Sequence, residues 1–423
     1  MSFFTVHHRS SKSKARMGTI QTDHGAIQTP AFVPVGTKGT IKGLTQPQIA
    51  ELGVQVSFVN TYHLVVHPGV EVLGRAGGVH NFAKYKIPLM SDSGGFQVFS
   101  LAQREREQSQ GQKSEGLKGS QKRTADVRGE EQPLVEKISE DGVLFRSTYD
   151  GQLINFTPET SMDFQRTIGA DINMAFDECT YHPATHEYTE KAMERTHRWL
   201  ERCIKVVQSR KVLKSESQKN RVDIETFRPS DLQTQNQYLY GIIQGGTYED
   251  LRKKSAEFVV AQNTPGVAIG GVSVGETKEE MRNQVKWVAP YLPLDRPVHL
   301  LGVGQVDDIV DLVKHGIDTF DCVEPTRVAR MGTAYQTAAV IAHLDGTYLP
   351  YEIDVNKAIY KGDLAPLDEN CSCSTCVNYS KAYLHHLFKQ RELLGYTLLS
   401  YHNIYVMERL MDTLRKSIEE NRI

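Results

Sequence analysis

Short apolar segments of strand length recur along the whole chain, and each stops abruptly at a glycine or a polar residue. Most of the segments between them show the apolar spacing of helices that bury one face. This repeated alternation predicts an α/β fold, a parallel (β/α)8 barrel of the TIM type. The expected strands are residues 31–36, 54–60, 88–93, 171–176, 238–243, 266–271, 298–302 and 318–323. The expected helices are residues 45–52, 186–208, 248–262, 278–288 and 306–315.

An open, doubly wound parallel sheet is the alternative that the same alternation allows. A glycine-rich G-x-G-x-x-G fingerprint after the first strand would favour that sheet. Residues 35–39 read Val-Gly-Thr-Lys-Gly and do not match the fingerprint. The pattern therefore favours the barrel.

Two polar stretches interrupt the alternation, and a tail of different character follows it. Residues 102–136 and 214–236 are predominantly polar, so we expect them to be surface insertions. After the eighth expected strand a connector rich in glycine and threonine leads to two helical segments, at 377–394 and 405–421. The tail is expected to form a small subdomain of its own.

Charge and hydropathy restrict the classes of partner. The 423 residues include 49 lysines and arginines against 51 aspartates and glutamates, so nucleic acid could be held only by a local basic patch. No apolar window approaches the length of a membrane span, and the N-terminus is too polar for a secretory signal. We therefore expect a cytoplasmic protein that does not associate with a membrane.

Polar side chains close several of the expected strands. Asp92, Asp177 and Asp321 close the third, fourth and eighth strands, and Gln244 closes the fifth. Functional groups of a (β/α)8 barrel lie at these carboxyl ends, although a single aspartate there often only caps the next helix. Several such groups, with no His-x-His in the first strand, favour acid/base or covalent carboxylate chemistry over a metal-dependent hydrolase.

The same groups suit a flat, polar ligand. Carboxylates and a carboxamide can read the N–H, amino and carbonyl edge of a purine-like base, and the glycine pairs 245–246 and 270–271 let the backbone approach it closely. Phe96 could stack on such a base, whereas a core position is the simpler explanation of that residue alone.

Arg327 and Arg330 lie just beyond Asp321, at the expected rim of the site. Arginines there can grip phosphates or read base edges, and a solvated pair of charges is the alternative. Cys203 is expected to pack within a helix and Cys322 to be a small buried side chain. Neither cysteine has the histidine partner of a catalytic thiol.

Cysteines crowd into the tail, where Cys371, Cys373 and Cys376 occupy six consecutive residues. In a chain without a secretory signal this spacing indicates a metal site rather than disulfides, and a fourth ligand would close a tetrahedral, structural zinc site. The candidates for the fourth ligand are His385, His386 and His402. His402 is favoured because we place it in a break between the two tail helices. The expected division is a barrel over 1–345 and a zinc-binding helical subdomain over 346–423.

Six motifs occur in order along the chain: SDSGGFQ (91–97), MAFDECT (174–180), QGG (244–246), GGVSVGE (270–276), FDCVEPTRVAR (320–330), and CSCSTC (371–376) followed by YHN (401–403). Together they resemble the motifs of the bacterial tRNA-guanine transglycosylases, over nearly the whole chain. Enzymes of that family exchange the wobble guanine of certain tRNAs for a 7-deazaguanine.

The resemblance implies a double displacement in which Asp321 is the nucleophile that attacks the ribose and Asp92 is the general acid/base. It implies that the Val272 carbonyl, supported by Glu276, receives an aminomethyl group. The implied base-binding residues are Ser93, Phe96, Asp177, Gln244, Gly271, Val272 and Glu276. The implied tRNA-binding residues are Arg327 and Arg330. The implied zinc ligands are Cys371, Cys373, Cys376 and His402.

The resemblance also implies the partners, which are a tRNA with a wobble guanine, a free 7-deazaguanine base and a second copy of the chain in a homodimer. Val274 and Cys179 match enzymes that take 7-aminomethyl-7-deazaguanine rather than the bulkier queuine. The alternatives are a non-catalytic tRNA-binding paralogue, which would be expected to lose the aspartates, and an archaeal-type enzyme, which would carry a further RNA-binding domain.

The chain departs from the family pattern at a few positions. Phe96 stands where the family usually has tyrosine, and Leu301 where it usually has methionine, so the base would still be sandwiched but one hydroxyl is lost. Glu324 and Met331 replace a more apolar and a more polar residue in the arginine segment. These two changes bear on contacts with the anticodon loop.

Overall fold

Eight parallel strands form the central sheet of the computed structural model, which describes residues 2–95, 134–147, 149–217, 234, 236–347 and 349–423. The strands are β4 (Ala31–Pro34), β5 (Ser57–Val59), β6 (Leu89–Ser91), β10 (Ile172–Met174), β11 (Tyr238–Ile243), β12 (Gly266–Ile269), β13 (Val298–Leu300) and β14 (Thr319–Cys322). Their order is β4-β14-β13-β12-β11-β10-β6-β5, and every neighbouring pair is parallel. Each strand lies within its predicted range.

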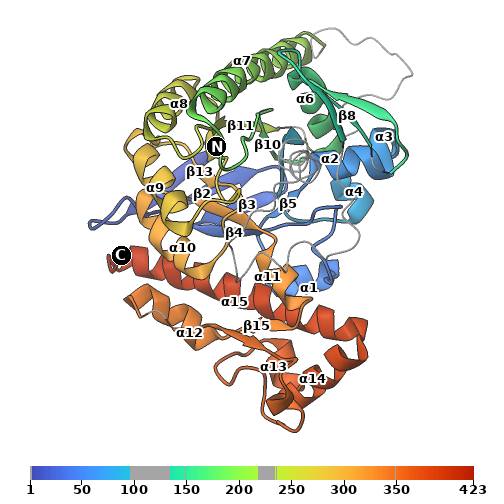
Figure 1. Cartoon of the computed structure of the whole chain (residues 1–423), viewed down its shortest axis with the longest axis vertical. Helices are drawn as coiled ribbons and strands as arrows, with labels where there is room; N and C mark the ends of the chain where they lie inside the picture. Colours follow the sequence, from blue (N-terminus) through green and yellow to red (C-terminus); the bar gives the residue numbers. More distant parts are fainter. Residues whose placement is uncertain (1, 96–133, 148, 218–233, 235, 348) are drawn as a thin grey trace.

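The two ends of this sheet meet and close it into a barrel (Figure 1). Val35 forms a parallel bridge with Phe58, and the Gly36 N–H donates to the Phe58 carbonyl at 2.7 Å. The predicted (β/α)8 barrel is therefore confirmed, and the open doubly wound sheet is excluded.

Side chains fill the barrel rather than leaving a pore. Val33, Phe58, Met174 and Tyr240 belong to one buried cluster. Gly266 makes room for the ring of Tyr240, because a Cβ at Gly266 would lie 2.3 Å from the ring carbons. The β12 strand thus gives up a side chain so that a large one can cross the barrel.

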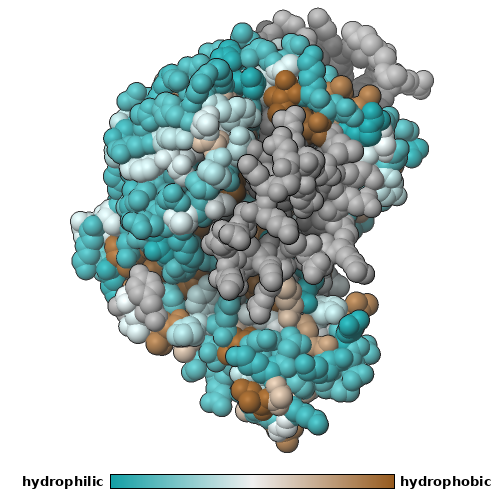
Figure 2. Space-filling view, viewed as in Figure 1, coloured by the Kyte–Doolittle hydropathy of each residue, from teal (hydrophilic) through white to brown (hydrophobic). Residues whose placement is uncertain are grey.

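Helices surround the barrel and follow the predicted order. They include α1 (Gln46–Glu51), α6 (Pro158–Ile168), α7 (His186–Ser217), α8 (Glu249–Ala261), α9 (Lys278–Val288) and α10 (Val306–Leu312). The α9 helix begins at a capping box, in which the Thr277 hydroxyl accepts from the Glu280 N–H and the Glu280 carboxylate accepts from the Thr277 N–H. The outward faces of α8 and α9 are mostly hydrophilic (Figure 2), as amphipathic helices around a core require. No helix in the described part of the chain is long and apolar enough to cross a membrane.

Three additional sheets were not predicted. The N-terminal sheet contains β1 (Phe4–Arg9), β2 (Arg16–Thr22) and β3 (Gly25–Thr29); the second contains β7 (Leu134–Ile138), β8 (Val143–Arg146) and β9 (Leu153–Phe156); the third pairs β15 (Thr333–Tyr335) with β16 (Glu352–Asp354). The β7 strand starts inside the stretch 102–136 that we expected to be an insertion, and α7 extends into the stretch 214–236. Most of both stretches lies outside the described residues.

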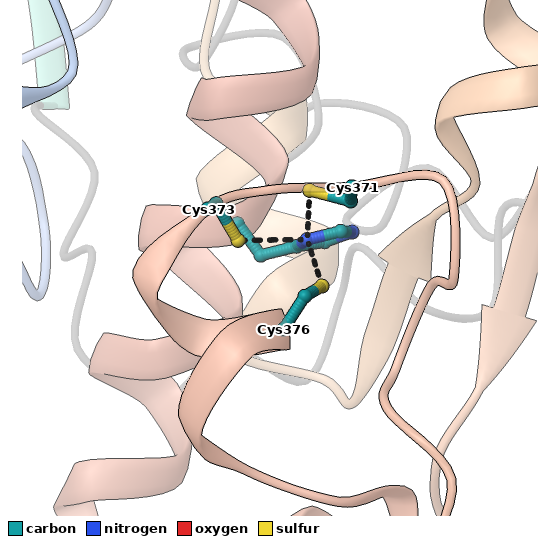
Figure 3. Close-up of side chains that lie close together, drawn as sticks. Cys371, Cys373 and Cys376 are labelled. Carbon is teal, nitrogen blue, oxygen red and sulfur yellow. Dashed lines mark hydrogen bonds between the residues drawn. The ribbon is translucent and has the colours of Figure 1, made fainter.

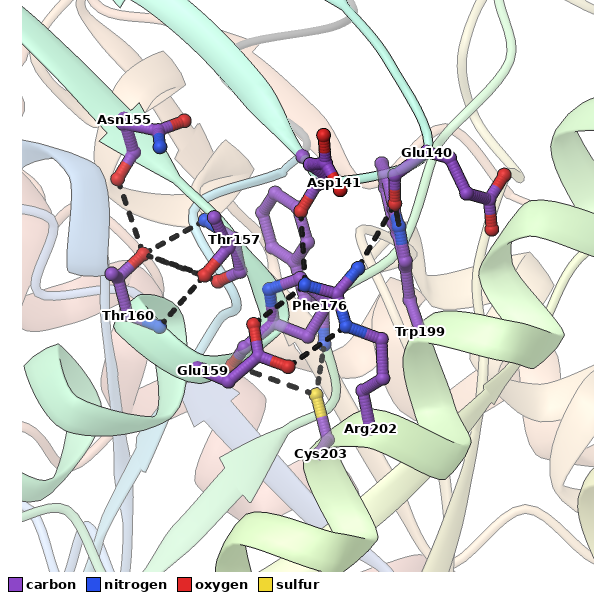
Figure 4. Close-up of polar contacts among 12 residues, drawn as sticks. Glu140, Asp141, Asn155, Thr157, Glu159, Thr160, Phe176, Trp199, Arg202 and Cys203 are labelled. Carbon is purple, nitrogen blue, oxygen red and sulfur yellow. Dashed lines mark hydrogen bonds and ion pairs between the residues drawn. The ribbon is translucent and has the colours of Figure 1, made fainter.

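A polar network joins the second sheet to the helices behind it (Figure 4). Arg202 of α7 donates to both carboxylate oxygens of Glu159 of α6, at 2.8 and 2.6 Å, and to the Glu140 carbonyl in the β7–β8 turn at 2.9 Å. The buried Cys203 Sγ accepts from the Phe176 N–H at 3.4 Å. Cys203 therefore packs within a helix as predicted.

The tail contains α13 (Ser374–Asn378), α14 (Lys381–Gln390) and the long α15 (Leu393–Glu419), which runs along the barrel (Figure 1). Asn403 of α15 donates to the carbonyls of Pro325 and Thr333, and Arg415 donates to the Pro30 carbonyl at 2.6 Å. The second tail helix thus begins at Leu393, earlier than the predicted residue 405. The domain boundary at residue 345 stays a prediction.

Glu408 lies buried in α15, and its Oε1 atom has no hydrogen-bond partner among the described residues. Burial raises the pKa of this carboxyl from 4.5 to about 8. Between pH 4.5 and about pH 8 the folded protein therefore keeps a proton that the unfolded chain releases. The free energy of unfolding falls as the pH rises through this range.

We predict that Glu408→Gln removes this loss. Relative to the unmutated protein, the variant should gain at least about 1 kcal/mol of unfolding free energy between about pH 5 and about pH 8, because glutamine does not ionise. Urea denaturation at the two pH values measures the difference. The exposed Glu419→Gln on the same helix is the control, and an equal effect of the two substitutions at both pH values contradicts the prediction.

Candidate functional site

The carboxyl ends of the barrel strands share one rim because all eight strands are parallel. Asp92 follows β6, Gln244 follows β11, and Asp321 lies near the end of β14. Asp177 comes three residues after β10. These four residues are buried, with 2% to 8% of their surface exposed, so the polar strand ends occupy a largely desolvated region.

Asp177 is the centre of a small hydrogen-bond network. The Ser93 hydroxyl donates to its Oδ1 at 2.9 Å, and the Gln244 Nε2 donates to its Oδ2 at 2.7 Å. Burial raises the pKa of Asp177 to about 6, although the bonds from Ser93 and Gln244 oppose that shift and the negative charge of Asp92 adds to it. The carboxyl group can therefore carry or release a proton near neutral pH.

The side-chain carbonyl of Gln244 is available as a hydrogen-bond acceptor. Its Oε1 is buried and has no partner within the described ranges. A ligand N–H that enters the site would remove this unfavourable state, because a buried carbonyl oxygen without a partner costs free energy.

Asp92 is held by donors from the segment after β5. Asn60 Nδ2 donates to Oδ2 at 2.5 Å, the Thr61 N–H donates to Oδ1 at 2.6 Å, and the Thr61 hydroxyl donates to the Asp92 carbonyl at 2.6 Å. The orientation of the carboxylate is therefore fixed. Asn60 was not singled out in the sequence, although it closes the predicted strand 54–60 and directly follows the observed strand β5.

Among the described residues, the contacts of Asp321 all go to one carboxylate oxygen. Its Oδ1 contacts His299 Nε2 at 3.1 Å and accepts from the Gly302 N–H at 3.0 Å, whereas Oδ2 forms no hydrogen bond with any residue that the structure describes. The buried His299 contacts the Thr319 hydroxyl through Nδ1 at 2.8 Å, which leaves Nε2–H to donate to Asp321. A fixed carboxylate with one oxygen left open is suited to nucleophilic attack.

The loop after β12 forms another part of the rim. Glu276 accepts from the N–H groups of Ser273 and Val274 at 2.5 and 2.9 Å. A trans peptide points its carbonyl away from its N–H, so the Val272 carbonyl faces away from Glu276. An open pocket with about 240 Å³ of empty space lies beside this loop and is lined by Gly271, Val274 and Glu276, among others.

Arg252 of α8 is a buried residue that sequence reasoning missed. It donates to the carbonyls of Gly246, Gly270 and Gly271 at 2.7, 2.6 and 2.7 Å. An arginine in an amphipathic helix is normally a surface residue, so only the tertiary structure reveals that its charge lies under the glycine turns.

The two arginines lie on and just after α11 (Glu324–Ala329), close in sequence to Asp321. Arg327 and Arg330 are half-buried, and Arg330 donates to the Thr326 carbonyl at 2.9 Å. The Glu324 carboxylate accepts from Gln305 Nε2 at 3.0 Å, and burial raises the pKa of that carboxyl. Cys322 is half-buried rather than buried as predicted, because it lies where β14 leaves the core.

The remaining predicted residues lie as follows. Phe96 lies outside the described residues. Leu301 is half-buried, and its side chain lies beside Gly270. Met331 is 38% exposed. Cys179 is buried, and its desolvation raises the pKa of the thiol. A neutral thiol of this kind fills space rather than attacking a substrate.

The tail brings Cys371, Cys373, Cys376 and His402 together, as predicted (Figure 3). The three sulfurs lie 3.6, 3.5 and 3.4 Å from His402 Nδ1, and all four residues are buried. Hydrogen bonds from Cys373 and Cys376 hold the pKa of the Cys371 thiol below its usual range. The cluster could therefore bind a metal ion, with Nδ1 as the nitrogen ligand.

His402 lies inside α15 and not in a break between helices, so its predicted place was wrong although its predicted neighbours were right. Its Nε2 contacts the Tyr335 carbonyl at 2.6 Å, which fixes the tautomer that leaves Nδ1 free to bind a metal. The other candidates are not ligands of this cluster, because His385 Nδ1 contacts the Val355 carbonyl and His386 is exposed.

Comparison with known proteins gives one consistent family. The family model described as Queuine tRNA-ribosyltransferase matches residues 10–423. A queuine tRNA-ribosyltransferase of Roseiflexus sp. (strain RS-1) is 42% identical over 419 residues, which cover 99% of this chain and 96% of that protein. Its counterpart in Caldanaerobacter subterraneus subsp. tengcongensis is 39% identical over 420 residues, which cover 99% of this chain and 94% of that protein. The similarity extends over both the barrel and the cysteine cluster.

Proposed function

The chain belongs to the queuine tRNA-ribosyltransferase family, and from this we propose that it is a tRNA-guanine transglycosylase of queuosine biosynthesis that replaces the anticodon wobble guanine with 7-aminomethyl-7-deazaguanine. The observation that carries the proposal is the shared rim, where Asp92, Asp177, Gln244 and Asp321 combine a held carboxylate, an open carboxylate oxygen and an unpaired amide oxygen. Incubating the protein with radiolabelled guanine and unmodified tRNA tests it directly, and the label must enter the RNA.

The proposed reaction has two displacements. Asp321 Oδ2 attacks the ribose anomeric carbon, the bond to the guanine nitrogen breaks, and Asp92 protonates the departing base. The incoming base then gives its N–H proton to Asp92 and attacks the same carbon, which releases Asp321. Two inversions retain the configuration, as in retaining glycosidases. His299 and the Gly302 N–H orient the nucleophile through its other oxygen.

Recognition of the base is proposed for the network around Asp177. The Asp177 carboxyl group can accept from the ring N–H and the amino group, while Gln244 and the Gly271 backbone face the remainder of the polar edge. Ser93 holds Asp177 in place. The Val272 carbonyl, turned away from Glu276, would accept hydrogen bonds from the aminomethyl group. Phe96 and Leu301 are the proposed stacking residues.

Arg327 and Arg330 are proposed to contact the anticodon loop of a tRNA with a wobble guanine, because they lie on and directly after the helix that follows the nucleophile. A homodimer, a cytoplasmic location and the domain boundary at residue 345 remain predictions that rest on the family resemblance and on the sequence. The retained aspartates count against a non-catalytic paralogue.

Zinc is the proposed metal of the Cys371, Cys373, Cys376 and His402 cluster. Zinc binds sulfur at about 2.3 Å and nitrogen at about 2.0 to 2.1 Å, so a tetrahedral ion holds its sulfur and nitrogen ligands about 3.5 Å apart. The observed separations of 3.4 to 3.6 Å fit that geometry. Four protein ligands leave no open position, so the ion would stabilise the tail and take no part in the reaction.

We predict that one zinc ion per chain survives dialysis and that Cys373→Ala lowers both the zinc content and the thermal midpoint, since three ligands hold zinc more weakly than four. Elemental analysis and calorimetry measure the two effects. Cys203→Ala removes an equally buried thiol outside the cluster and should leave the zinc content unchanged. Metal-free protein with full activity and unchanged stability is inconsistent with this site.

We predict that Asp321→Asn abolishes base exchange and the denaturant-resistant adduct with tRNA, because an amide cannot displace the base. The affinity for tRNA should stay within about threefold, since the substitution changes one buried contact and no arginine. Gel shifts under native and denaturing conditions separate the two readouts. Asp295→Asn, at an exposed position, is the control. An adduct that persists in Asp321→Asn would transfer the role to Asp92 or Asp177.

We predict that the unmutated enzyme uses queuine poorly and that Val274→Gly improves its use. The Val274 side chain lines the pocket beside the proposed aminomethyl site, and overfilling such a pocket costs about 1 to 3 kcal/mol, roughly tenfold to a hundredfold in kcat/KM. Competition between queuine and 7-aminomethyl-7-deazaguanine on one tRNA measures the ratio. Guanine exchange serves as the control and should change little. Equal kcat/KM values for both bases in the unmutated enzyme would refute the steric argument.

A further inference from the structure

Arg252 places a positive charge under the proposed base site, and the nearby charge of Glu276 acts on it without direct contact. The side chain is fully buried, and its donors reach the carbonyls of Gly246, Gly270 and Gly271 as well as Oε1 of Gln284. No carboxylate forms an ion pair with it anywhere in the described chain. A buried guanidinium usually requires a paired charge, so a set of backbone carbonyls in that place indicates that the backbone itself is what the arginine holds.

The direction of these bonds determines what the loop shows to a ligand. The Gly270 carbonyl shares a peptide with the Gly271 N–H, and the Gly271 carbonyl shares one with the Val272 N–H. Both peptides are trans, so an arginine that binds the two carbonyls turns both N–H groups away from itself. The Gly271 N–H is turned toward the Cys179 thiol, and the Cα of Gly271 lies beside the Gln244 side chain.

The backbone conformation at Gly271 is one that only glycine can adopt at this place. Its φ angle is +61°, and a Cβ there would lie 2.2 Å from Gln244 Oε1. Glycine is required at this position, and a glycine pair is flexible unless other groups fix it. The two bonds from Arg252 supply that restraint, at 2.6 and 2.7 Å.

A relay continues from Arg252 to the far end of the loop. Gln284 of α9 accepts from Arg252 through Oε1 and donates through Nε2 to Glu276 Oε1 at 3.3 Å. Glu276 in turn binds the N–H groups of Ser273 and Val274. Arg252 thus binds the turn after β11 and the glycine pair after β12 directly, and it is linked to the carboxylate of Glu276 through Gln284.

We propose that Arg252 is a positioning residue for the incoming base: it fixes the 270–272 backbone so that the Gly271 N–H points away from the arginine, to the side of Cys179 where the base would bind, and through Gln284 it holds Glu276 behind the Val272 carbonyl. This inference rests on the proposed function. The two residues have different roles. Arg252 positions the backbone that binds the polar edge of every base, whereas Gln284 affects only binding of the aminomethyl group.

The experiment compares three variants in guanine exchange and in incorporation of 7-aminomethyl-7-deazaguanine. Arg252→Lys keeps the charge, but its compact ammonium lacks the planar fork of donors that spans the three glycine carbonyls. Gln284→Leu keeps the bonds from Arg252 to the glycines and breaks the relay. Arg296→Met is the matched control, because Arg296 also donates to two carbonyls, those of Val260 and Thr264, at the opposite end of β12.

For Arg252→Lys we expect the KM of both bases to rise about tenfold to a hundredfold, the range for loss of a buried hydrogen-bond partner, while the KM of tRNA changes less than about threefold. For Gln284→Leu we expect a rise of at least about fivefold for the aminomethyl base alone. Arg296→Met should lower the thermal midpoint and leave each KM unchanged.

Calorimetric binding of free guanine, without tRNA, is measured alongside and should weaken in Arg252→Lys by the same factor as the KM. Base KM values that stay normal in Arg252→Lys, or that rise equally in Arg296→Met, would overturn the inference and leave Arg252 as a purely structural residue. Failure of the unmutated chain to exchange guanine would instead contradict the proposed function. Even in that case, unaltered guanine binding in Arg252→Lys would decide against a positioning role of Arg252.

Discussion

Closure of the parallel sheet is the constraint on which the rest of the structure depends. Once Val35 pairs with Phe58, every strand must end at the same rim, and residues far apart in the sequence become neighbours there. Ser93 follows the third barrel strand and Gln244 the fifth, with a long stretch of chain between them, yet both bind the carboxylate of Asp177. The chemistry of the site follows from strand direction first and from individual side chains second.

The sequence revealed the elements whose apolar side chains follow a regular pattern of burial. Barrel strands are buried throughout and mostly apolar because both faces are covered, and all eight were located. The antiparallel sheets β1–β3 and β7–β9 were missed because their strands are half-exposed and owe their stability to pairing with each other. The start of α15 was missed because His402 and Asn403 are polar but buried, with partners on other elements, and a helix pattern treats such residues as surface.

The candidate site divides in the same way. Asp92, Asp177, Gln244 and Asp321 could be found because each follows an apolar strand and carries chemistry of its own. Asn60, His299 and Arg252 could not, because they act on other groups and not on a ligand, and only the contacts reveal this. The signals available were Asn60 at the end of the predicted strand 54–60 and a histidine in the middle of strand 298–300. Supporting residues of this kind are visible only once the tertiary structure is known.

The path of α15 has a consequence for synthesis of the protein. This helix is made after every barrel strand, yet Arg415 binds the Pro30 carbonyl just before β4 and Asn403 binds the Pro325 carbonyl in the arginine helix. Folding during translation proceeds from the N-terminus, so the first strand and α11 must wait for the last helix before their supports are complete. A nascent chain whose barrel has already closed therefore still lacks the contacts that hold α11, and these can form only after α15 has left the ribosome.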